Sequence, residues 1–226
     1  MSIEIYKTGA TPVIRGVLFD MDGLILDTEK LYARFWMEAC HFYGFPMTYE
    51  QSLHMRAANS RLSQEILHRF FGPEADYKIL RAKRIELMDA FIAENGVEVK
   101  PGTPELLAFL EEQGIPCAIC SSSPPERICA HLSSLGLYHR FSAICSGYEV
   151  PWGKPAPDIY LHGAAALGLP AEACLALEDA PLGIESAFRA GCVPVMVPDQ
   201  DQPDDAIKAM LYAKADSLLD IIDLLK

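Results

Sequence analysis

Long apolar runs are missing from this sequence. No stretch of its 226 residues offers the roughly 18 consecutive apolar residues that are needed to cross a bilayer. Residues 1–16 mix Glu4, Lys7 and Arg15 into their apolar positions, so they also lack the apolar stretch of about 7 to 15 residues that is typical of a signal peptide. We therefore expect a cytoplasmic protein that has no membrane partner.

Positive charge is scarce as well. The 19 Lys and Arg residues are outnumbered by 31 Asp and Glu residues, which gives a net charge of −12. A chain of this sign repels the phosphates of nucleic acids and anionic lipids, so we expect no nucleic-acid partner. The sequence also contains no Gly-rich dinucleotide-binding loop and no Walker loop.

The seven cysteines are odd in number and lie mostly in apolar segments, where a thiol behaves as a small apolar side chain. We expect them to be reduced and buried. Cys117 and Cys120 have the CxxC spacing of redox and zinc sites. They fall in a predicted strand, however, where they lie about 10 Å apart on opposite faces, beyond the roughly 7 Å that a disulfide spans.

What is present is the composition of a globular protein, with 50% hydrophobic and 22% charged residues. The length allows one large domain or a core with an insertion, at roughly 150 residues per domain. From about residue 100, short apolar runs alternate with helical stretches, which is typical of a parallel sheet with crossover helices. The predicted strands are 17–19, 115–120, 142–145, 174–178 and 193–197. The predicted helices, each followed by a glycine, are 103–113, 124–135, 157–167 and 181–190.

A long helical segment separates the first two predicted strands. Its apolar residues Leu31, Phe35, Ala39 and Phe42 recur at roughly helical spacing. The chain returns from it through Lys100-Pro101-Gly102, a connection rich in helix breakers that is suited to a hinge. Helices are predicted over 29–43, 61–71 and 75–94. The predicted domains are a core of residues 1–28 and 99–226 and a helical insertion of residues 29–98.

Two carboxylates, Asp20 and Asp22, follow the first predicted strand. Open α/β sheets bind ligands at the carboxyl ends of their strands, so chemistry is expected there. A carboxylate in this place can attack phosphorus, and a second one two residues on can protonate the leaving oxygen and later activate water. The alternative interpretation of the pair is a solvated acidic turn.

Glu65 and His68 have the ExxH spacing of carboxylate-bridged di-iron bundles. Such bundles need a second copy of the motif and further glutamates, and the sequence contains one copy. We therefore interpret Glu65 and His68 as a pair on a helix surface.

Three further segments accompany the Asp20–Asp22 motif: Cys120-Ser121-Ser122 at one strand end, Gly153-Lys154-Pro155-Ala156-Pro157-Asp158, and Leu177-Glu178-Asp179 at another strand end. The four motifs, in this order and spread over nearly the whole chain, resemble those of the haloacid dehalogenase superfamily. The likeness is nearest to the subfamily of β-phosphoglucomutase and the small sugar-phosphate phosphatases. It implies an α/β fold, with a Rossmann-like parallel sheet core and an inserted all-helical cap domain.

The resemblance implies a role for each motif residue. Asp20 is expected to be the nucleophile and Asp22 the general acid/base. Ser121 is expected to hydrogen-bond the transferring phosphoryl group, helped by backbone N–H groups of the turn that contains Ser122. Lys154 is expected to hold the nucleophile and the phosphate together, because a carboxylate that attacks a phosphate dianion needs cations nearby.

The resemblance also implies a Mg²⁺ cofactor bound by Asp20, the backbone carbonyl of Asp22, Glu178 and Asp179. An all-oxygen ligand set suits Mg²⁺, whereas zinc is usually held by His or Cys. The alternative interpretation of Glu178 and Asp179 is the N-cap of a helix that begins at Pro181.

The insertion resembles the helical cap that closes over the active site in this subfamily, and Thr28 stands at its entry, where the family keeps a hinge. Closure of such a cap expels water and lets cap residues recognise the non-reacting part of the substrate. We expect substrate contacts in the loop 52–61, where Arg56 and Arg61 can bind a second phosphate or a sugar hydroxyl. Both arginines can equally cap helices at the surface.

The sequence thus predicts a monomeric Mg²⁺-dependent phosphatase that hydrolyses a small phosphorylated metabolite, such as a sugar or polyol phosphate, through an aspartyl-phosphate on Asp20. The alternative is a mutase of the β-phosphoglucomutase type, although Tyr32 and Pro124-Pro125 stand where that enzyme carries a His and a Lys-Asn pair. Dehalogenases of the superfamily lack the second aspartate, so Asp22 argues against them. A receiver-type signalling domain also phosphorylates an aspartate, but it carries that residue on a middle strand, whereas Asp20 follows the first strand. A non-catalytic binding protein with the same fold remains an open alternative.

Overall fold

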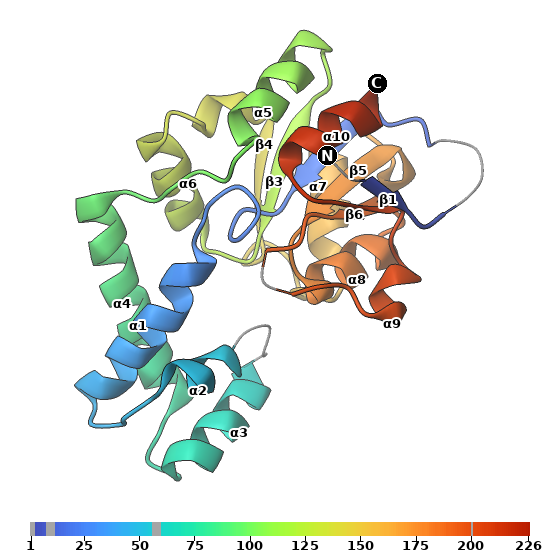
Figure 1. Ribbon diagram of the computed structural model, residues 1–226. Coiled ribbons are helices and arrows are strands. Elements are labelled where there is room, and N and C mark those ends of the chain that lie inside the picture. Colours follow the sequence, from blue (N-terminus) through green and yellow to red (C-terminus); the bar gives the residue numbers. More distant parts are fainter. Residues whose placement is uncertain (1–2, 8–11, 56–59, 200) are drawn as a thin grey trace. The chain divides into compact units, whose positions relative to one another are not determined.

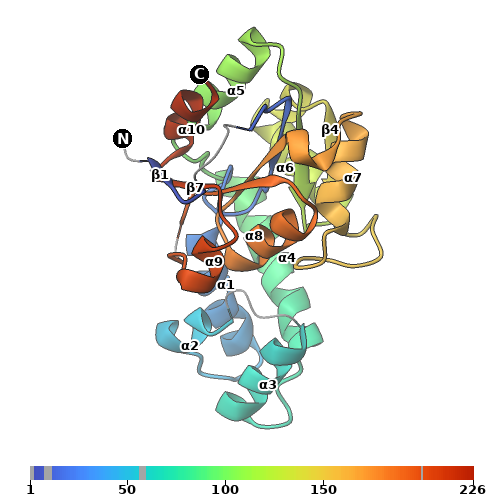
Figure 2. The same cartoon turned by 90° about the vertical axis from the view of Figure 1, so that its right-hand side faces the viewer.

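The computed structural model describes residues 3–7, 12–55, 60–199 and 201–226 (Figures 1 and 2). The chain divides into two compact units, Met1–Leu26 with Val99–Lys226, and Asp27–Glu98. The first unit contains a seven-stranded sheet and the helices that cover it, and the second unit is helical. Among the described residues no helix is both long enough and apolar enough to span a membrane.

The sheet of the first unit has the strand order β1-β7-β6-β5-β2-β3-β4, and all of its pairs are parallel except β1 with β7. This confirms the predicted Rossmann-like core. The strands are β1 (Ile3–Ile5), β2 (Gly16–Phe19), β3 (Cys117–Ser121), β4 (Ala143–Ser146), β5 (Cys174–Glu178), β6 (Val193–Met196) and β7 (Ala213–Ala215). The strands β1 and β7 are not among the predicted elements, because three residues are too few to show a hydrophobic period, and Ala-Lys-Ala of β7 also has little strand propensity.

Helices cover both faces of this sheet. On one face, Leu18 of β2 and Ala176 of β5 pack with Tyr160 of α7 and Ala187 of α8 in one buried cluster. On the other face, the ring of Phe19 meets that of Phe141 edge to face at 5.9 Å. Figure 1 shows α5 and α10 next to each other, and the two helices are in contact. The helices are α5 (Thr103–Glu112), α6 (Pro125–Ser134), α7 (Asp158–Ala166), α8 (Pro181–Arg189), α9 (Asp205–Lys208) and α10 (Leu218–Leu225).

Helices α5 to α8 of the first unit end close to the glycines that the sequence predicts as their ends. The glycines after α5, α6, α7 and α8 all have positive φ, from 65° to 80°, which ends a helix at little cost because glycine has no Cβ. The predicted elements end at residue 197, so α9 and α10 come in addition. Helix α10 begins with a capping box, in which the Asp220 carboxylate accepts from the Ser217 N–H at 3.0 Å.

The second unit consists of α1 (Glu29–Phe42), α2 (Tyr49–Leu53), α3 (Ser60–Phe71) and α4 (Tyr77–Asn95). Helix α4 begins two residues later than predicted, because the Asp76 carboxylate caps it by accepting from the Lys78 N–H at 2.7 Å. Helix α2 is not among the predicted elements, and Thr48 and Gln51 form its capping box. The core of this unit contains Trp36, Cys40, Met47, Met55, Ile66, Leu67, Ala75 and Leu80.

The chain passes between the units twice, and the two passages are paired. Leu26 bridges to Val99, the Lys100 N–H donates to the Ile25 carbonyl at 2.7 Å, and the Asp27 N–H donates to the Glu98 carbonyl at 2.9 Å. Of the predicted hinge residues, Thr28 directly follows the first passage, and Lys100-Pro101-Gly102 begins within the second. Thr28 is buried, and it is the N-cap residue of α1.

Candidate active site

Three neighbouring strands bring the predicted motif residues to one edge of the sheet. Strand β2 lies between β5 and β3, so the residues that end these strands are neighbours in space. Asp20 directly follows β2, and its N–H donates to the Leu177 carbonyl of β5 at 3.0 Å. Ser121 is the last residue of β3 and Glu178 is the last residue of β5. All three side chains are buried.

Lys154 lies in the loop between β4 and α7 and reaches two of these carboxylates. Its Nζ is 2.5 Å from Oδ1 of Asp20 and 2.6 Å from Oε1 of Glu178. Burial lowers the pKa of the Lys154 ammonium, but the attraction of the two carboxylates outweighs burial and holds its pKa above the ordinary value. Lys154 therefore carries a fixed positive charge at the end of β2.

Asp20 lies in a setting that disfavours its own charge. Burial raises the pKa of its carboxyl group, Lys154 partly offsets this effect, and the negative charge of Glu178 adds to it, so that the pKa lies at about 7. The ordinary value is 3.8. A second cation beside Lys154 would therefore favour the ionised form that a nucleophile needs.

The turn after β3 is tied to the motif on β2. Ser121 Oγ accepts from the Ser123 N–H at 3.1 Å, and Ser123 Oγ donates to Oδ2 of Asp22 at 3.0 Å. Ser146, at the end of β4, donates its hydroxyl to the Ser123 carbonyl at 2.7 Å. Ser122 is exposed. Ser123 thus contacts Asp22, the predicted acid/base, although the sequence motifs assign no role to the Ser123 side chain.

Tyr160 of α7 is a second residue of the site that lies outside the positions assigned from the sequence motifs. Its hydroxyl donates to Oε1 of Glu178 at 2.6 Å, and Nζ of Lys154 lies 5.1 Å from the centre of its ring. The side chain is fully buried. The sequence predicts a helix at this position but not the hydrogen bond to Glu178, because that bond depends on how α7 lies against β5.

The acidic residues at this edge fit a metal ion. Carboxylate oxygens of Asp20, Glu178 and Asp179 lie within 4.8 Å of one another, and all three residues are buried. No other group of three such ligands occurs in the described part of the chain. An all-oxygen set of this kind suits a hard divalent cation. The alternative interpretation of Asp179 as a helix cap is wrong, since the N-cap of α8 is Ala180, with no side-chain cap hydrogen bond.

The arginines predicted to read the substrate belong to the second unit. Arg56 lies outside the described residues. Arg61 is 90% exposed and its Nε lies 3.1 Å from a carboxylate oxygen of Glu65, one turn further along α3. A role for either arginine in substrate binding stays a prediction. Glu65 and His68 are exposed on this helix, which confirms the interpretation of that pair as surface residues.

The cysteines are structural. All seven are free thiols, and six of them are buried. Cys117 and Cys120 both lie in β3, where their spacing places them on opposite faces, as expected.

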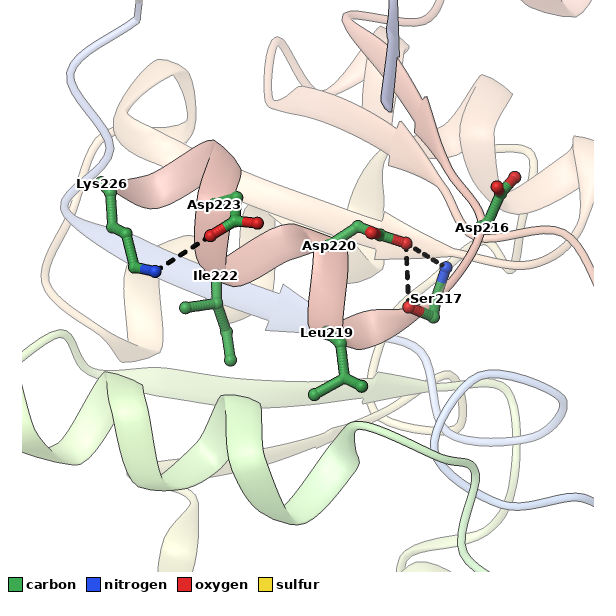
Figure 3. Close-up of a pocket in the computed structure, with 7 residues that line it drawn as sticks. All are labelled: Asp216, Ser217, Leu219, Asp220, Ile222, Asp223 and Lys226. Atoms are coloured by element: carbon green, nitrogen blue, oxygen red, sulfur yellow. Dashed lines mark hydrogen bonds and ion pairs between the residues drawn. The ribbon is translucent and has the colours of Figure 1, made fainter. Parts of the chain in front are cut away.

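A pocket elsewhere in the first unit contains none of the motif residues (Figure 3). In Figure 3, Leu219 and Ile222 of α10 point to the same side of the helix, and Asp220 points toward Ser217. The acidic side chains there are not among the groups that could hold a metal ion. The pocket is lined by Asp216, Ser217, Leu219, Asp220, Ile222, Asp223 and Lys226.

The fold and the site together define a Rossmann-like α/β enzyme with buried carboxylates and a lysine at the end of a central strand. A model of the haloacid dehalogenase-like hydrolases matches residues 14–191, and the chain belongs to that family, as its motifs predict.

Several relatives of the chain are named as phosphatases. Hexitol phosphatase A of Escherichia coli is 33% identical over 186 residues, which cover 81% of this chain and 82% of that protein. A phosphorylated carbohydrates phosphatase of Thermotoga maritima is 29% identical over 178 residues, which cover 79% and 82%. The crystal structure of β-phosphoglucomutase from Clostridium difficile is 22% identical and matches with a TM-score of 0.73 over 92% and 93% of the two chains, which shows the shared fold. The chain is thus a hydrolase of phosphoric monoesters, as predicted.

Proposed function

We propose that this enzyme is a Mg²⁺-dependent phosphatase that hydrolyses a small phosphorylated sugar or polyol through an aspartyl-phosphate on Asp20. The observation that carries the proposal is the position of Lys154, whose Nζ contacts both Asp20 and Glu178 at the edge of the sheet. A buried ammonium in this place can hold a carboxylate nucleophile and an incoming phosphoryl group against their mutual repulsion.

The chemistry assigned to these residues has two steps. In the first, a carboxylate oxygen of Asp20 attacks phosphorus, the bond to the ester oxygen breaks, and Asp22 gives a proton to the leaving alcohol. In the second, Asp22 removes a proton from water as the water attacks the same phosphorus, and the bond to Asp20 breaks to release phosphate. The Ser121 hydroxyl and the turn that follows bind the phosphoryl oxygens during both steps.

The Mg²⁺ site comprises Asp20, Glu178, Asp179 and the backbone carbonyl of Asp22. Three of these residues supply the oxygens that lie within 4.8 Å of one another. When bound, the cation supplies positive charge that offsets the negative charge of the phosphoryl group and of the carboxylates. Among the described residues, Lys154 contributes the one ammonium that contacts Asp20, so we expect the Mg²⁺ ion and this ammonium to act together.

Two observations support a sugar or polyol phosphate as the substrate and hydrolysis as the outcome. Two of the relatives named above are a hexitol phosphatase and a phosphorylated carbohydrates phosphatase. Helix α6 begins with Pro124 as N-cap and Pro125 as its first residue, directly after the Ser121 turn, so neither side chain can bind a second phosphate for a mutase. We assign to the helical unit Asp27–Glu98 the role of the cap that recognises the non-reacting part of this substrate.

The test is a screen of phosphorylated sugars and polyols with the protein first dialysed against EDTA and then supplied with Mg²⁺. We expect phosphate release only when the cation is present, and full activity in excess EDTA would contradict the proposal. A parallel reaction with β-glucose 1-phosphate, Mg²⁺ and a trace of the 1,6-bisphosphate separates the two outcomes of phosphoryl transfer. Rapid isomerisation to glucose 6-phosphate with little phosphate released would make the protein a mutase.

A further inference from the structure

The Glu178 carboxylate is held by groups from two different segments. Its Oε1 accepts from Lys154 Nζ at 2.6 Å and from the Tyr160 hydroxyl at 2.6 Å. Its Oε2 has no hydrogen-bond partner among the described residues. The two donors thus converge on one oxygen of a carboxylate that also belongs to the acidic cluster with Asp20 and Asp179.

Packing alone does not account for the Tyr160 hydroxyl. The ring belongs to an apolar cluster that includes Leu18, Cys120 and Ala164, and a phenylalanine ring would fill the same space. Taking a hydroxyl out of water costs free energy unless it forms a hydrogen bond. Within the described part of the chain, the one hydrogen bond that this hydroxyl forms is the bond to Glu178.

We propose that Tyr160 is a positioning residue of the active site, which fixes Oε1 of Glu178 so that Oε2 is presented to the metal ion and Lys154 is left to serve Asp20 and the phosphoryl group. The inference rests on the metal-dependent phosphatase function proposed above.

Charge explains why a neutral donor suits this task. The acids Asp20, Glu178 and Asp179 form the cluster that would hold the cation, and Lys154 is the ammonium that contacts two of them. A second ammonium on Glu178 would orient it equally well but would repel a divalent cation. The phenol hydroxyl orients the carboxylate without adding charge, so the attraction of the cluster for the cation is kept.

The ring of Tyr160 acts on the other partner of Glu178. Nζ of Lys154 lies 5.1 Å from the ring centre, within the range of a cation–π contact. The side chain of Lys154 is long and flexible, and in the proposed reaction it serves the nucleophile, Glu178 and the phosphate. Because Tyr160 binds Glu178 through its hydroxyl and Lys154 through its ring, Glu178 keeps its orientation when the ammonium turns toward the phosphate.

The test is Tyr160→Phe, which removes only the hydroxyl. Partners that orient a metal-ligating carboxylate typically contribute about 10- to 100-fold to metal affinity or activity. We expect Mg²⁺ affinity, measured by calorimetric titration without substrate, to weaken by about 10-fold, and kcat at limiting Mg²⁺ to fall with it. Raising Mg²⁺ should restore much of kcat, a recovery that a merely structural role of the hydroxyl would not produce.

The matched control is Tyr212→Phe, since Tyr212 is half-buried in the same unit and its hydroxyl has no hydrogen-bond partner in the part of the chain that the structure describes. It should leave Mg²⁺ affinity unchanged. A second variant, Tyr160→4-aminophenylalanine, restores a donor on the ring and should recover Mg²⁺ affinity. Unchanged affinity in Tyr160→Phe, with the wild-type protein binding Mg²⁺ in the same titration, would overturn this inference. Absence of Mg²⁺ binding by the wild-type protein would instead contradict the proposed function.

Discussion

At the scale of single residues, Asp20 is the side chain on which the proposed chemistry depends. Asp20→Asn keeps the shape of the carboxylate and removes its ability to form the acyl phosphate. We expect kcat to fall by about 10³-fold or more, while the far-UV circular dichroism spectrum stays unchanged. Asp223→Asn, at an exposed position on α10, is the control and should keep its activity. Turnover by the Asp20 variant near the wild-type rate would exclude the covalent route.

The burial of Asp20 also predicts how many protons are released when Mg²⁺ binds. Burial raises the pKa of its carboxyl group to about 7, so the group is largely protonated at pH 6 and largely ionised at pH 8.5. A metal ion binds the ionised form, so Mg²⁺ binding should release a proton at pH 6 and almost none at pH 8.5. Calorimetric titrations in buffers of different ionisation enthalpy measure this release. Equal proton release at both pH values would contradict the expected titration of Asp20.

The sequence predicts the residues of the site better than their contacts. Asp20, Ser121, Lys154 and Glu178 could be assigned from motifs, because each follows or ends a strand or lies in a recognisable segment. The contacts of Ser123 and Tyr160 could not be predicted. Their hydrogen bonds to Asp22 and Glu178 depend on side-chain rotamers and on how one element lies against another, which no local pattern encodes.

At the scale of elements, the start of α8 is built around Glu178. A Cβ on Gly183 would lie 1.9 Å from Oε1 of Glu178, a separation that real Cβ contacts do not show. Helix propensity alone predicts that Gly183→Ala stabilises the protein by about 0.5 to 1 kcal/mol. We expect the opposite sign, a loss of about 1 to 3 kcal/mol from overpacking, in urea unfolding experiments.

A double-mutant cycle identifies the clash as the cause. In a Glu178→Ala background the space opposite Gly183 is empty, so Gly183→Ala should no longer destabilise the protein and should recover its helix-forming benefit. If Gly183→Ala costs the same in both backgrounds, the destabilisation has another origin.

Elements with a strong hydrophobic period are the ones that the sequence predicts. Strands β2 to β6 and the helices α5 to α8 lie within a few residues of their predicted bounds, since buried parallel strands are apolar runs and a glycine follows each helix. Short elements such as α2, α9, β1 and β7 escape prediction. Their stability comes from capping side chains and from pairing with distant strands, as when Ile3–Ile5 joins Ala213–Ala215.

At the scale of the whole molecule, we expect the first unit to carry out the reaction and the second unit to determine which substrate is preferred. The motif residues all lie in the first unit, and the segment 52–61, whose ends belong to α2 and α3, lies in the second. We expect Arg56→Ala and Arg61→Ala to change the ranking of kcat/KM among several sugar and polyol phosphates, by about 10-fold for the most affected substrate. Neither change should alter the Mg²⁺ dependence.

Arg69→Ala is the matched control for both variants, since Arg69 is an exposed arginine on α3. It should leave the substrate ranking as it is in the wild-type protein. If Arg56→Ala and Arg61→Ala change the ranking no more than this control does, the residues that read the substrate lie outside the loop 52–61.

The burial of the cysteines has a practical consequence for spectroscopy. Cys129 on α6 is the one cysteine that is not fully buried, and burial raises the pKa of Cys40 and Cys117 to about 12. A maleimide dye should therefore attach to a single thiol of the folded, unaltered protein and to all seven thiols after denaturation, as mass spectrometry would show. Because α6 follows the Ser121 turn, we expect the fluorescence of a dye on Cys129 to change when phosphate binds at the proposed site.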